Sequence, residues 1–468
     1  PGVELKDIDW VVAHATGTPA GDSAEFKTLK EIYGKAERSI YLTSNKSLIG
    51  HTGWAAGVAS IIQVVLGLQK GAIPPQHRFT ATPAHFEIEK CSLKIPTKVT
   101  AWPSKAQGAR AAAISGFGFG GTNAHMVIQE YLPQAKPAPK RKRAYQERVA
   151  IVGWSAYLPG LETNAEIESW LKGSGKGPQA SFGEFYPLPP FDKVRMPPST
   201  IRTIDRCQLM VLECAQRLRS QLGDFWENNK FKSGVLMGHM GQTRAATLYG
   251  LRSYLDDVKK ELHANPYLAK SSRLEEVLAT LTGEVRKLAP PANEDAFPGS
   301  MPNVIPARVT NYFDLKGLNI TLDTGFSSTL TTFEMASRYL RSRELDMILV
   351  GGINGNSMEE MRVILRDLGV AGEPALAEGA FLFALTTQAT AWQDNLPILG
   401  FVGDLSLKKQ AATGSENEIE AGFNHAAPNY LGAEGALAVL RALHSGKPET
   451  TISCRETATG PVTQLKIY

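Results

Sequence analysis

The sequence lacks the features that mark several common protein classes. It has only four cysteines, Cys91, Cys207, Cys214 and Cys454, which are scattered and show no metal-ligand spacing. This argues against a disulfide framework or a metal site and favours a reducing, cytoplasmic setting. Because no run of about 18 apolar residues occurs, we expect no membrane-spanning helix. The net charge of +4 is small for 468 residues and gives no reason to expect nucleic acid or an anionic membrane as a partner.

What the chain contains is the balance of a globular protein, with 43% apolar and 21% charged residues. Strand-like apolar runs alternate with helical patterns, which predicts an α/β layered fold. The expected strands are Asp9–Ala13, Ala111–Ser115, Ala124–Gln129, Val149–Gly153, Gly234–Gly238, Asn319–Asp323 and Asp346–Gly352. Because the first of these strands runs straight into a motif so early in the sequence, we expect that residues upstream of position 1 are missing.

Composition divides the chain into three parts. Residues 1–132 form one expected domain, residues 133–147 a Pro- and Lys/Arg-rich linker, and residues 148–468 a second domain. The basic cluster Lys140–Arg143 is interpreted as part of a solvated linker, with a targeting or nucleic-acid patch as the alternative. In the first domain, Ala55–Gly67 is nearly all apolar and predicts a helix buried on most faces. Such a helix needs more cover than 132 residues readily provide.

Two histidines follow glycine-containing turns in the first domain. His14 opens His-Ala-Thr-Gly-Thr after an expected strand, and Gly17 permits a tight turn that leaves the imidazole facing a pocket. His51 ends Asn-Lys-Ser-Leu-Ile-Gly-His just before the apolar helix, whose N-terminal dipole favours a neutral imidazole. Lys46 could orient His51 or attract a substrate carboxylate. The alternatives are a hydrogen-bonded core histidine and a surface lysine.

A glycine-rich turn, Gly116–His125, connects two expected strands with the sequence Gly-Phe-Gly-Phe-Gly-Gly-Thr-Asn-Ala-His. Its first glycines fit the start of a dinucleotide fingerprint, but no suitable helix follows and no acidic residue lies about 20 positions later. We interpret it as a mobile aromatic turn beside a pocket, with Phe119 as a movable plug. A tight turn that packs both phenylalanines into the core is the alternative.

The two domains share a pattern. Asn45–Gly57 resembles Asn429–Ala438, because both place Asn and then Gly before a long apolar helix. In this comparison Ala433 stands where the first copy has His51. The pattern predicts a duplicated fold whose second copy has lost its chemistry.

Taken together, the three motifs of residues 1–132 resemble the C-terminal half of a β-ketoacyl synthase of the thiolase superfamily, and they occur in family order. Ala15 stands where many relatives have glycine, and Ala13–Glu25 looks most like the ketosynthases of polyunsaturated fatty acid synthases. The resemblance implies a thiolase-like, layered αβαβα fold that is duplicated along the chain.

The resemblance also implies roles for single residues. His14 and His51 would bind the thioester carbonyl of a malonyl group carried on the phosphopantetheine of an acyl carrier protein, and stabilise the enolate as CO2 leaves. Lys46 would position His51 and the departing carboxylate, while Thr16, Thr18 and Phe119 would line and gate the substrate tunnel. No metal and no directly bound cofactor is expected. The family nucleophile is a cysteine at a helix N-terminus, and we expect none of the four cysteines to have that context.

Residues 148–468 resemble a ketosynthase less closely. Asp-Thr-Gly-Phe-Ser-Ser, residues 323–328, stands where the family has Asp-Thr-Ala-Cys-Ser-Ser, so Phe326 replaces the nucleophile. Ala433 replaces the second histidine, and residues 405–428 show no counterpart of the first. This resembles a chain length factor, the inactive partner that pairs with a ketosynthase in a pseudo-dimer and limits product length. Phe326 would fill the space of the missing thiol, which is compatible with a plain core aromatic.

Three functions compete. The first is a ketosynthase–chain length factor didomain of a polyunsaturated fatty acid or polyketide synthase, acting on malonyl and acyl groups of an acyl carrier protein alongside other synthase domains. The pseudo-dimer could be part of a larger homo-oligomer. The second is a non-catalytic structural subunit that pairs with a separate ketosynthase. The third, a thiolase acting on free CoA esters, is disfavoured because thiolases use a second cysteine in place of one histidine.

Overall fold

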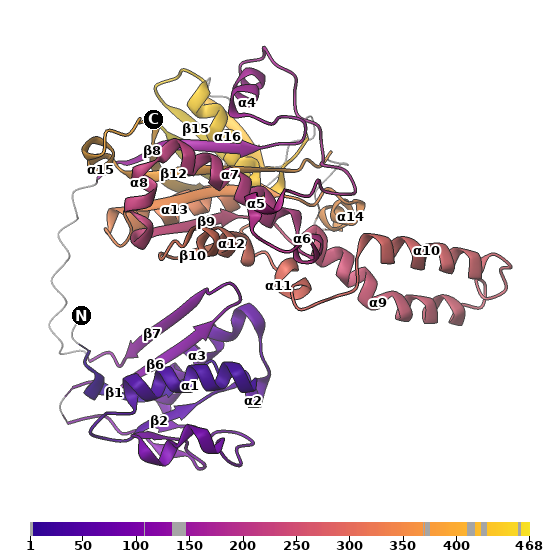
Figure 1. The fold of residues 1–468 in the computed structure, drawn as a ribbon. Helices are drawn as coiled ribbons and strands as arrows, with labels where there is room; N and C mark the ends of the chain where they lie inside the picture. The colour runs from indigo at the N-terminus through magenta and orange to yellow at the C-terminus, as the bar shows by residue number, and fades with distance from the viewer. Residues whose placement is uncertain are drawn as a thin grey trace. The chain divides into compact units, whose positions relative to one another are not determined.

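The computed structural model describes residues 3–106, 108–132, 147–367, 369, 375–409, 417–422, 428–456 and 460–468. The chain divides into two compact units, Pro1–Arg141 (unit 1) and Lys142–Tyr468 (unit 2), each with its own core (Figure 1). The expected linker, residues 133–147, lies outside the described residues except for Glu147. Among the described residues, no helix is both long and apolar enough to cross a membrane.

Unit 1 is built on a five-stranded sheet in the order β4-β2-β1-β6-β7, parallel except for β7. The strands are β1 (Ile8–Val12), β2 (Ile40–Thr43), β4 (Leu93–Lys94), β6 (Ala111–Phe117) and β7 (Asn123–Gln129). Helix α1 (Pro19–Tyr33) contributes to one core, and α3 (Ala56–Lys70) contributes to the other. Short elements complete the unit: α2 (Lys46–Ile49), β3 (Ala72–Ile73) and β5 (Thr100–Ala101).

The central strand β1 shows why this sheet has helices on two sides. Val11 belongs to the core that includes α1, whereas Trp10 and Val12 belong to the core that includes α3. All five β1 residues are buried, as expected for a central parallel strand. Close packing reaches α3 itself, because a Cβ on Gly67 would lie 2.9 Å from the Trp10 ring. The strand therefore fixes the loop that follows it, which carries His14.

Helix α3 is much less buried than its sequence predicts. Its buried residues are Ala56, Ser60, Val64 and Gly67. Large apolar side chains on its other faces are exposed: Val58 by 57%, Ile62 by 53%, Val65 by 40% and Leu66 by 46%. The prediction of burial on most faces is wrong for this chain, because the described residues cover α3 with a sheet on one side only.

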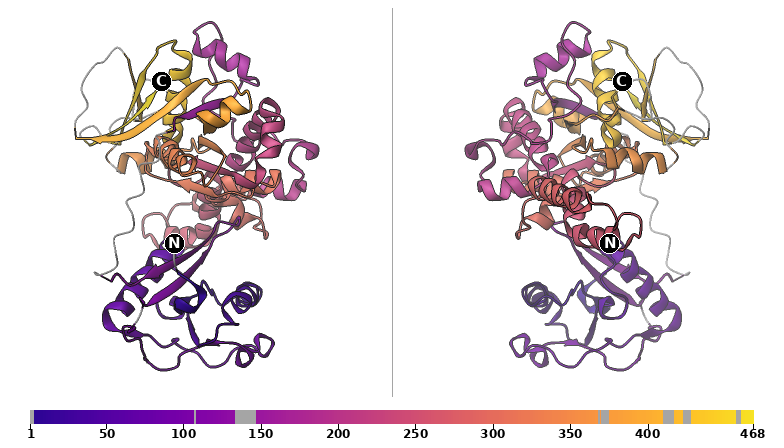
Figure 2. Two further views of the ribbon diagram at one scale, coloured as in Figure 1. Left: turned by 90° about the vertical axis from the view of Figure 1, so that its left-hand side faces the viewer. Right: turned by 90° about the vertical axis from the view of Figure 1, so that its right-hand side faces the viewer.

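Unit 2 has a nine-stranded sheet in the order β10-β9-β11-β12-β8-β13-β16-β15-β14. The first half holds β8 (Val149–Tyr157), β9 (Ser233–Gly238), β10 (Asn319–Leu322), β11 (Met347–Asn354) and β12 (Gly379–Thr387). The second half holds β13 (Gly400–Lys408), β14 (Glu418–Gly422), β15 (Thr450–Arg455) and β16 (Val462–Ile467). Antiparallel pairing of β8 with β13 joins the halves, so both ends of unit 2 meet in one sheet (Figure 1, Figure 2).

Helices lie on both faces of this sheet. Helices α7 (Arg206–Leu222) and α12 (Val304–Phe313) pack on one face, and α13 (Ser328–Arg341) and α16 (Glu434–His444) pack together on the other. The pair α13 and α16 contacts strands of both sheet halves, which makes it a central layer. The remaining helices are α4 (Asn164–Leu171), α5 (Phe191–Val194), α6 (Pro198–Thr203), α8 (Asp224–Asn228), α9 (Arg244–Ala264), α10 (Leu274–Leu288), α11 (Ala296–Ser300), α14 (Glu359–Asp367) and α15 (Gln388–Gln393).

The expected strands are confirmed to within a few residues at their ends, and so is the layered α/β fold. The long helices α9 and α10 were not expected as a pair. They form a hairpin that projects from the rest of unit 2 (Figure 1).

Candidate active site

His14 and His51 come together in unit 1. Their ring centroids are 5.4 Å apart and the rings are nearly perpendicular. His14 directly follows the buried end of β1, where Ala15 with φ 29° and Gly17 with φ 83° turn the chain sharply. His51 follows Gly50, which has φ 79°, and precedes the short turn that leads into α3. The two motifs are far apart in sequence, and the pairing of β1 with β2 brings them to one end of the sheet.

Backbone hydrogen bonds set which nitrogen of each ring can donate. The N–H of Gly53 donates to Nδ1 of His51 at 3.0 Å, and the N–H of Phe117 donates to Nδ1 of His14 at 3.4 Å. A neutral imidazole whose Nδ1 accepts a hydrogen bond carries its proton on Nε2. Each ring therefore offers an Nε2–H donor.

The pKa of His14 keeps that ring neutral. Burial, followed by the positive charges of Lys46 and His51, lowers the pKa of His14 to about 4. Burial also lowers the pKa of Lys46, although the carboxylates of Glu25 and Asp22 oppose the shift. At neutral pH the site thus combines a neutral His14 with a half-buried ammonium group.

Glu25 holds the His14 loop in place, a role that the sequence analysis missed. Its two carboxylate oxygens accept the backbone N–H groups of His14 at 2.8 Å and Ala15 at 2.7 Å. The side chain comes from α1 and is buried, and burial raises its pKa against the effect of these hydrogen bonds. The signal in the sequence was an acidic residue on the amphipathic helix right after the histidine motif.

The tunnel residues inferred from the resemblance lie at or near the surface. Thr16 and Thr18 are exposed and their hydroxyl oxygens are 3.2 Å apart. Phe119 is 53% exposed in the turn between β6 and β7. The aromatic ring that contacts His14 is that of Phe117, at 5.5 Å between centroids. A gating role for Phe119 stays a prediction.

A cavity of about 430 Å³ opens beside the histidines. Its polar lining includes Thr16, Glu25, Lys46 and His51, and its apolar lining includes Phe26. A space of this size falls within the range of small-molecule sites, about 300–1,000 Å³. The cavity therefore offers an apolar chamber with a cation and a histidine at its wall.

None of the four cysteines supplies a nucleophile to this site. Cys91 donates its S–H to the carbonyl of Ile88 at 3.2 Å, in a turn after α1. Cys207, contrary to expectation, does lie in the first turn of a helix, α7. Burial and the Asp205 carboxylate raise the pKa of the Cys207 thiol, so it is not activated. Burial likewise raises the pKa of Cys214 and Cys454.

The second copy has a carboxylate where a nucleophile elbow would bind an oxyanion. Phe326 is 2% exposed, and its N–H and that of Ser327 each donate to the carboxylate of Glu456 at 2.7 Å. Gly325 makes this possible, because it has φ 72° and a Cβ there would collide with the Glu456 carboxylate. The family pattern has alanine at this position. Glu456 therefore fills the N-terminal end of α13.

The register of the second copy differs from the sequence comparison. A 3-10 turn precedes the helix in both copies, Gly53–Ala55 before α3 and Leu431–Ala433 before α16. This aligns Ala433 with Ala55, and it aligns Asn429 with His51. The hydrogen bonds agree, because the N–H of Leu431 donates to Oδ1 of Asn429 at 2.7 Å just as Gly53 donates to His51.

The pairing of Ala433 with His51 is therefore wrong, and Asn429 holds the position of the lost histidine. The error arose because both copies contain Gly at the chosen position. The spacing from that glycine to the helix differs between the copies, so the shared glycine misled the comparison. Among the described residues, no group of three His, Cys, Asp or Glu side chains could hold a metal ion.

Comparison with known protein families agrees with this two-part arrangement. The model of the β-ketoacyl synthase C-terminal domain matches residues 1–80, and that of the ketoacyl-synthetase C-terminal extension matches residues 84–160. The model of the β-ketoacyl synthase N-terminal domain matches residues 189–371. The chain carries β-ketoacyl synthase domains. The order of the matches, C-terminal part first, fits the end of one ketosynthase followed by a second.

Solved structures and curated relatives extend the comparison. PfaC keto synthase–chain length factor matches with a TM-score of 0.76 and 17% identity over 99% of this chain and 57% of that chain. The fold is thus the thiolase-like ketosynthase fold. A reducing polyketide synthase of Hypomyces subiculosus is 41% identical over 138 residues, 29% of this chain and 6% of that protein. A phenolphthiocerol/phthiocerol polyketide synthase of Mycobacterium tuberculosis is 33% identical over 177 residues, 37% and 9% respectively. This ketosynthase chain spans less than a tenth of the length of either curated relative.

Proposed function

We propose that unit 1 is the histidine-bearing half of a condensing site that joins a malonyl group and an acyl group, both delivered by an acyl carrier protein. The observation that supports this most directly is the pair of rings 5.4 Å apart, each with Nδ1 engaged by a backbone N–H. Two Nε2–H donors side by side suit an oxygen on which negative charge develops. The reaction is a decarboxylative Claisen condensation that lengthens the acyl chain by two carbons.

The chemical steps assign a task to each group. Loss of CO2 from the malonyl thioester leaves its electron pair in an enolate, whose oxygen receives the Nε2–H donors of His14 and His51. The enolate carbon then attacks the carbonyl of an acyl thioester held on a cysteine, and the cysteine thiolate departs. A neutral His14 is required, because an imidazolium would protonate the enolate carbon and quench it. The Lys46 ammonium attracts the malonyl carboxylate before decarboxylation and orients the His51 segment.

The nucleophilic cysteine comes, in this proposal, from a ketosynthase half-domain outside this sequence that covers α3. Unit 2 contains both halves of the same fold and supports the idea. There α13 covers α16, and the Thr329 hydroxyl donates to the carbonyl of Gly432 at 2.6 Å. The residue of unit 1 that aligns with Gly432 is Trp54, which is 84% exposed. A helix equivalent to α13 would cover Trp54 and the exposed apolar face of α3.

Unit 2 is, in the same proposal, an inactive partner that limits chain length, as in a chain length factor of a polyunsaturated fatty acid or polyketide synthase. Three substitutions support its silence. Phe326 has no nucleophilic atom, Asn429 replaces a histidine, and Glu456 occupies the N–H groups of the elbow. Pairing of unit 2 with a complete ketosynthase would place its side chains around the growing acyl chain.

The test combines the full chain with a ketosynthase half-domain that carries an Asp-Thr-Ala-Cys-Ser-Ser elbow, and measures CO2 release from malonyl–acyl carrier protein. We expect release only when both polypeptides are present. His51→Ala should abolish it, while the matched control His263→Ala, on the exposed hairpin of unit 2, should leave it intact. Carrier-bound acyl chains of graded length then report the length limit.

The alternative is a purely structural subunit. It predicts that the two polypeptides associate but release no CO2, and that His51→Ala changes nothing. Measurable condensation by a Phe326→Cys variant of unit 2 without the added half-domain would instead refute the silence of the second copy.

A further inference from the structure

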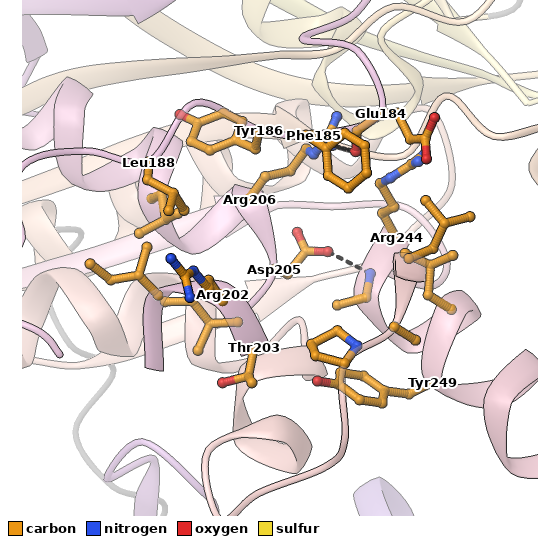
Figure 3. A pocket seen from close by; sticks show the side chains of 18 of the residues that line it. Glu184, Phe185, Tyr186, Leu188, Arg202, Thr203, Asp205, Arg206, Arg244 and Tyr249 are labelled. Carbon is orange, nitrogen blue, oxygen red and sulfur yellow. Dashed lines mark hydrogen bonds between the residues drawn. The ribbon is translucent and has the colours of Figure 1, made fainter. Parts of the chain in front are cut away.

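A second cavity, of about 340 Å³, lies wholly within unit 2 and away from the elbow of Phe326. It opens at the base of the α9–α10 hairpin, where the end of α6, the start of α7 and the loop of residues 184–188 meet (Figure 3). Its size is at the lower end of the range for small-molecule sites, about 300–1,000 Å³. The condensing chemistry proposed above uses none of its residues.

Most of the cavity wall is apolar. The apolar lining residues are Phe185, Leu188, Ile201, Ile204, Leu209, Ala245, Leu248, Leu288, Ala289 and Pro290. Ile201, Ile204 and Leu209 are buried, so this side of the wall is part of the fixed core. An apolar ligand segment in contact with them leaves water at little polar cost.

One positive charge in the cavity has no partner. Arg244 is half-buried at the first position of α9, and its guanidinium makes no hydrogen bond or ion pair with the described residues. The neighbouring charges are engaged elsewhere. Arg206 pairs with the buried Glu378 at 2.8 Å, and Asp205 accepts the N–H groups of Cys207 and Ala245.

The remaining charged groups lie at the rim. Glu184 and Lys287 are about half exposed and 3.9 Å apart, so they largely balance each other. Arg202 is exposed. Figure 3 shows Arg206 and Arg244 on the same side of the cavity, with Tyr249 at its opposite end. The Tyr249 hydroxyl is buried and has no hydrogen-bond partner among the described residues.

We propose that this cavity binds an organic monocarboxylate with a medium-length apolar tail. The carboxylate would receive the guanidinium of Arg244, which presents a planar pair of N–H donors suited to that group. The tail would lie along Ile201, Leu209 and Leu248. A neutral ligand would leave Arg244 unpaired, and an anion without a tail would leave the apolar wall wet, so both parts of the ligand are needed.

The test is calorimetric titration of the full chain with octanoate, with octanol and acetate as the tail-only and charge-only probes. Octanoate should bind saturably at one site per chain, and both other probes about tenfold more weakly or worse. Arg244→Gln should weaken octanoate binding about tenfold, and Arg244→Lys should weaken it less because the charge is kept. Arg338→Gln, on an exposed part of α13, is the matched control and should bind as the native chain does.

Thermal unfolding checks that each variant is folded. If Arg244→Gln does not fold, Leu248→Phe serves instead, because it narrows the cavity and leaves the charge in place, and it too should weaken binding. Equal affinity of octanol and octanoate, equal affinity of the native chain and the folded variant, or no saturable binding of octanoate at about 1 mM would each overturn the proposal. Binding here is measured without the half-domain, so its outcome does not depend on the condensing activity of unit 1.

Discussion

At the scale of single residues, the two copies differ by small replacements within preserved geometry. Asn429 accepts the same backbone hydrogen bond as His51, from the N–H two residues later. The loop keeps its shape while the side chain loses its second nitrogen and thus its ability to stabilise an enolate. Motif spacing predicted His14 and His51, but it could not show Glu25 or Phe117. Those two act through backbone N–H groups, which no residue pattern specifies.

Replacement of Glu456 tests how the silent elbow is stabilised. In Glu456→Ala, the N–H groups of Phe326 and Ser327 lose their carboxylate, and unpaired buried donors cost about 1–3 kcal/mol. Urea unfolding should therefore show a loss of that order. Glu449→Gln, which removes an exposed pair with Lys466, is the control and should stay within about 0.5 kcal/mol.

Gly325→Ala should destabilise the native chain too, since the new Cβ meets the Glu456 carboxylate at a strained φ of 72°. In the Glu456→Ala background the cost should fall to that of backbone strain alone, so the two changes should not be additive. Strict additivity in the unfolding free energies would contradict this account.

The depressed pKa of His14 predicts how acid affects unit 1. The folded pKa is about 4, and an unfolded histidine titrates near 6.5. Between about pH 6.5 and pH 4 the unfolded chain binds a proton that folded His14 does not, so stability falls as the pH falls through this window. His14→Gln removes this contribution. The urea midpoint of the variant should therefore drop less than that of the native chain between pH 7 and pH 5, and equal drops would count against a neutral, half-buried His14.

At the scale of elements, α3 and α16 occupy equivalent places but differ in cover. In α16 the residues from Glu434 to Leu440 are all buried, because α13 lies on the side away from its strands. In α3 the comparable face is open. The sequence predicted the start of α3 to within one residue and the end to within three, but not its exposure. An apolar pattern states what a helix can bury, whereas the covering layer belongs to other residues.

The two faces of α3 should respond differently to substitution. Val64 is fully buried against the sheet, so Val64→Ala should cost about 2 kcal/mol in urea unfolding. Ile62 is 53% exposed, so Ile62→Gln should change the stability of this chain by no more than about 0.5 kcal/mol. The same Ile62→Gln change should weaken association with the added half-domain, measured by sedimentation. Strong destabilisation by Ile62→Gln in the isolated chain would mean that this face is already covered.

At the scale of the whole molecule, the chain joins two units with separate cores. The sequence predicted a duplicated layered fold because strands and glycine turns recur in a fixed order. It did not predict the α9–α10 hairpin, since the polar and apolar pattern of residues 244–288 fits any amphipathic helix and does not show which way a helix pair projects. Nor did it reveal the cavity around Arg244, whose wall is assembled from four separate segments.

Separate cores predict separate unfolding. The cores of unit 1 contain Val64 and those of unit 2 contain Leu330, and no core cluster of the described residues includes residues of both units. Calorimetry of the full chain should therefore show two transitions, because each core can lose its packing without the other. Val64→Ala should lower the temperature of one transition only, and Leu330→Ala that of the other only. A single transition that both variants shift would show that the two units unfold as one cooperative body, and the view of unit 1 as an incomplete, separately stabilised half would then fail.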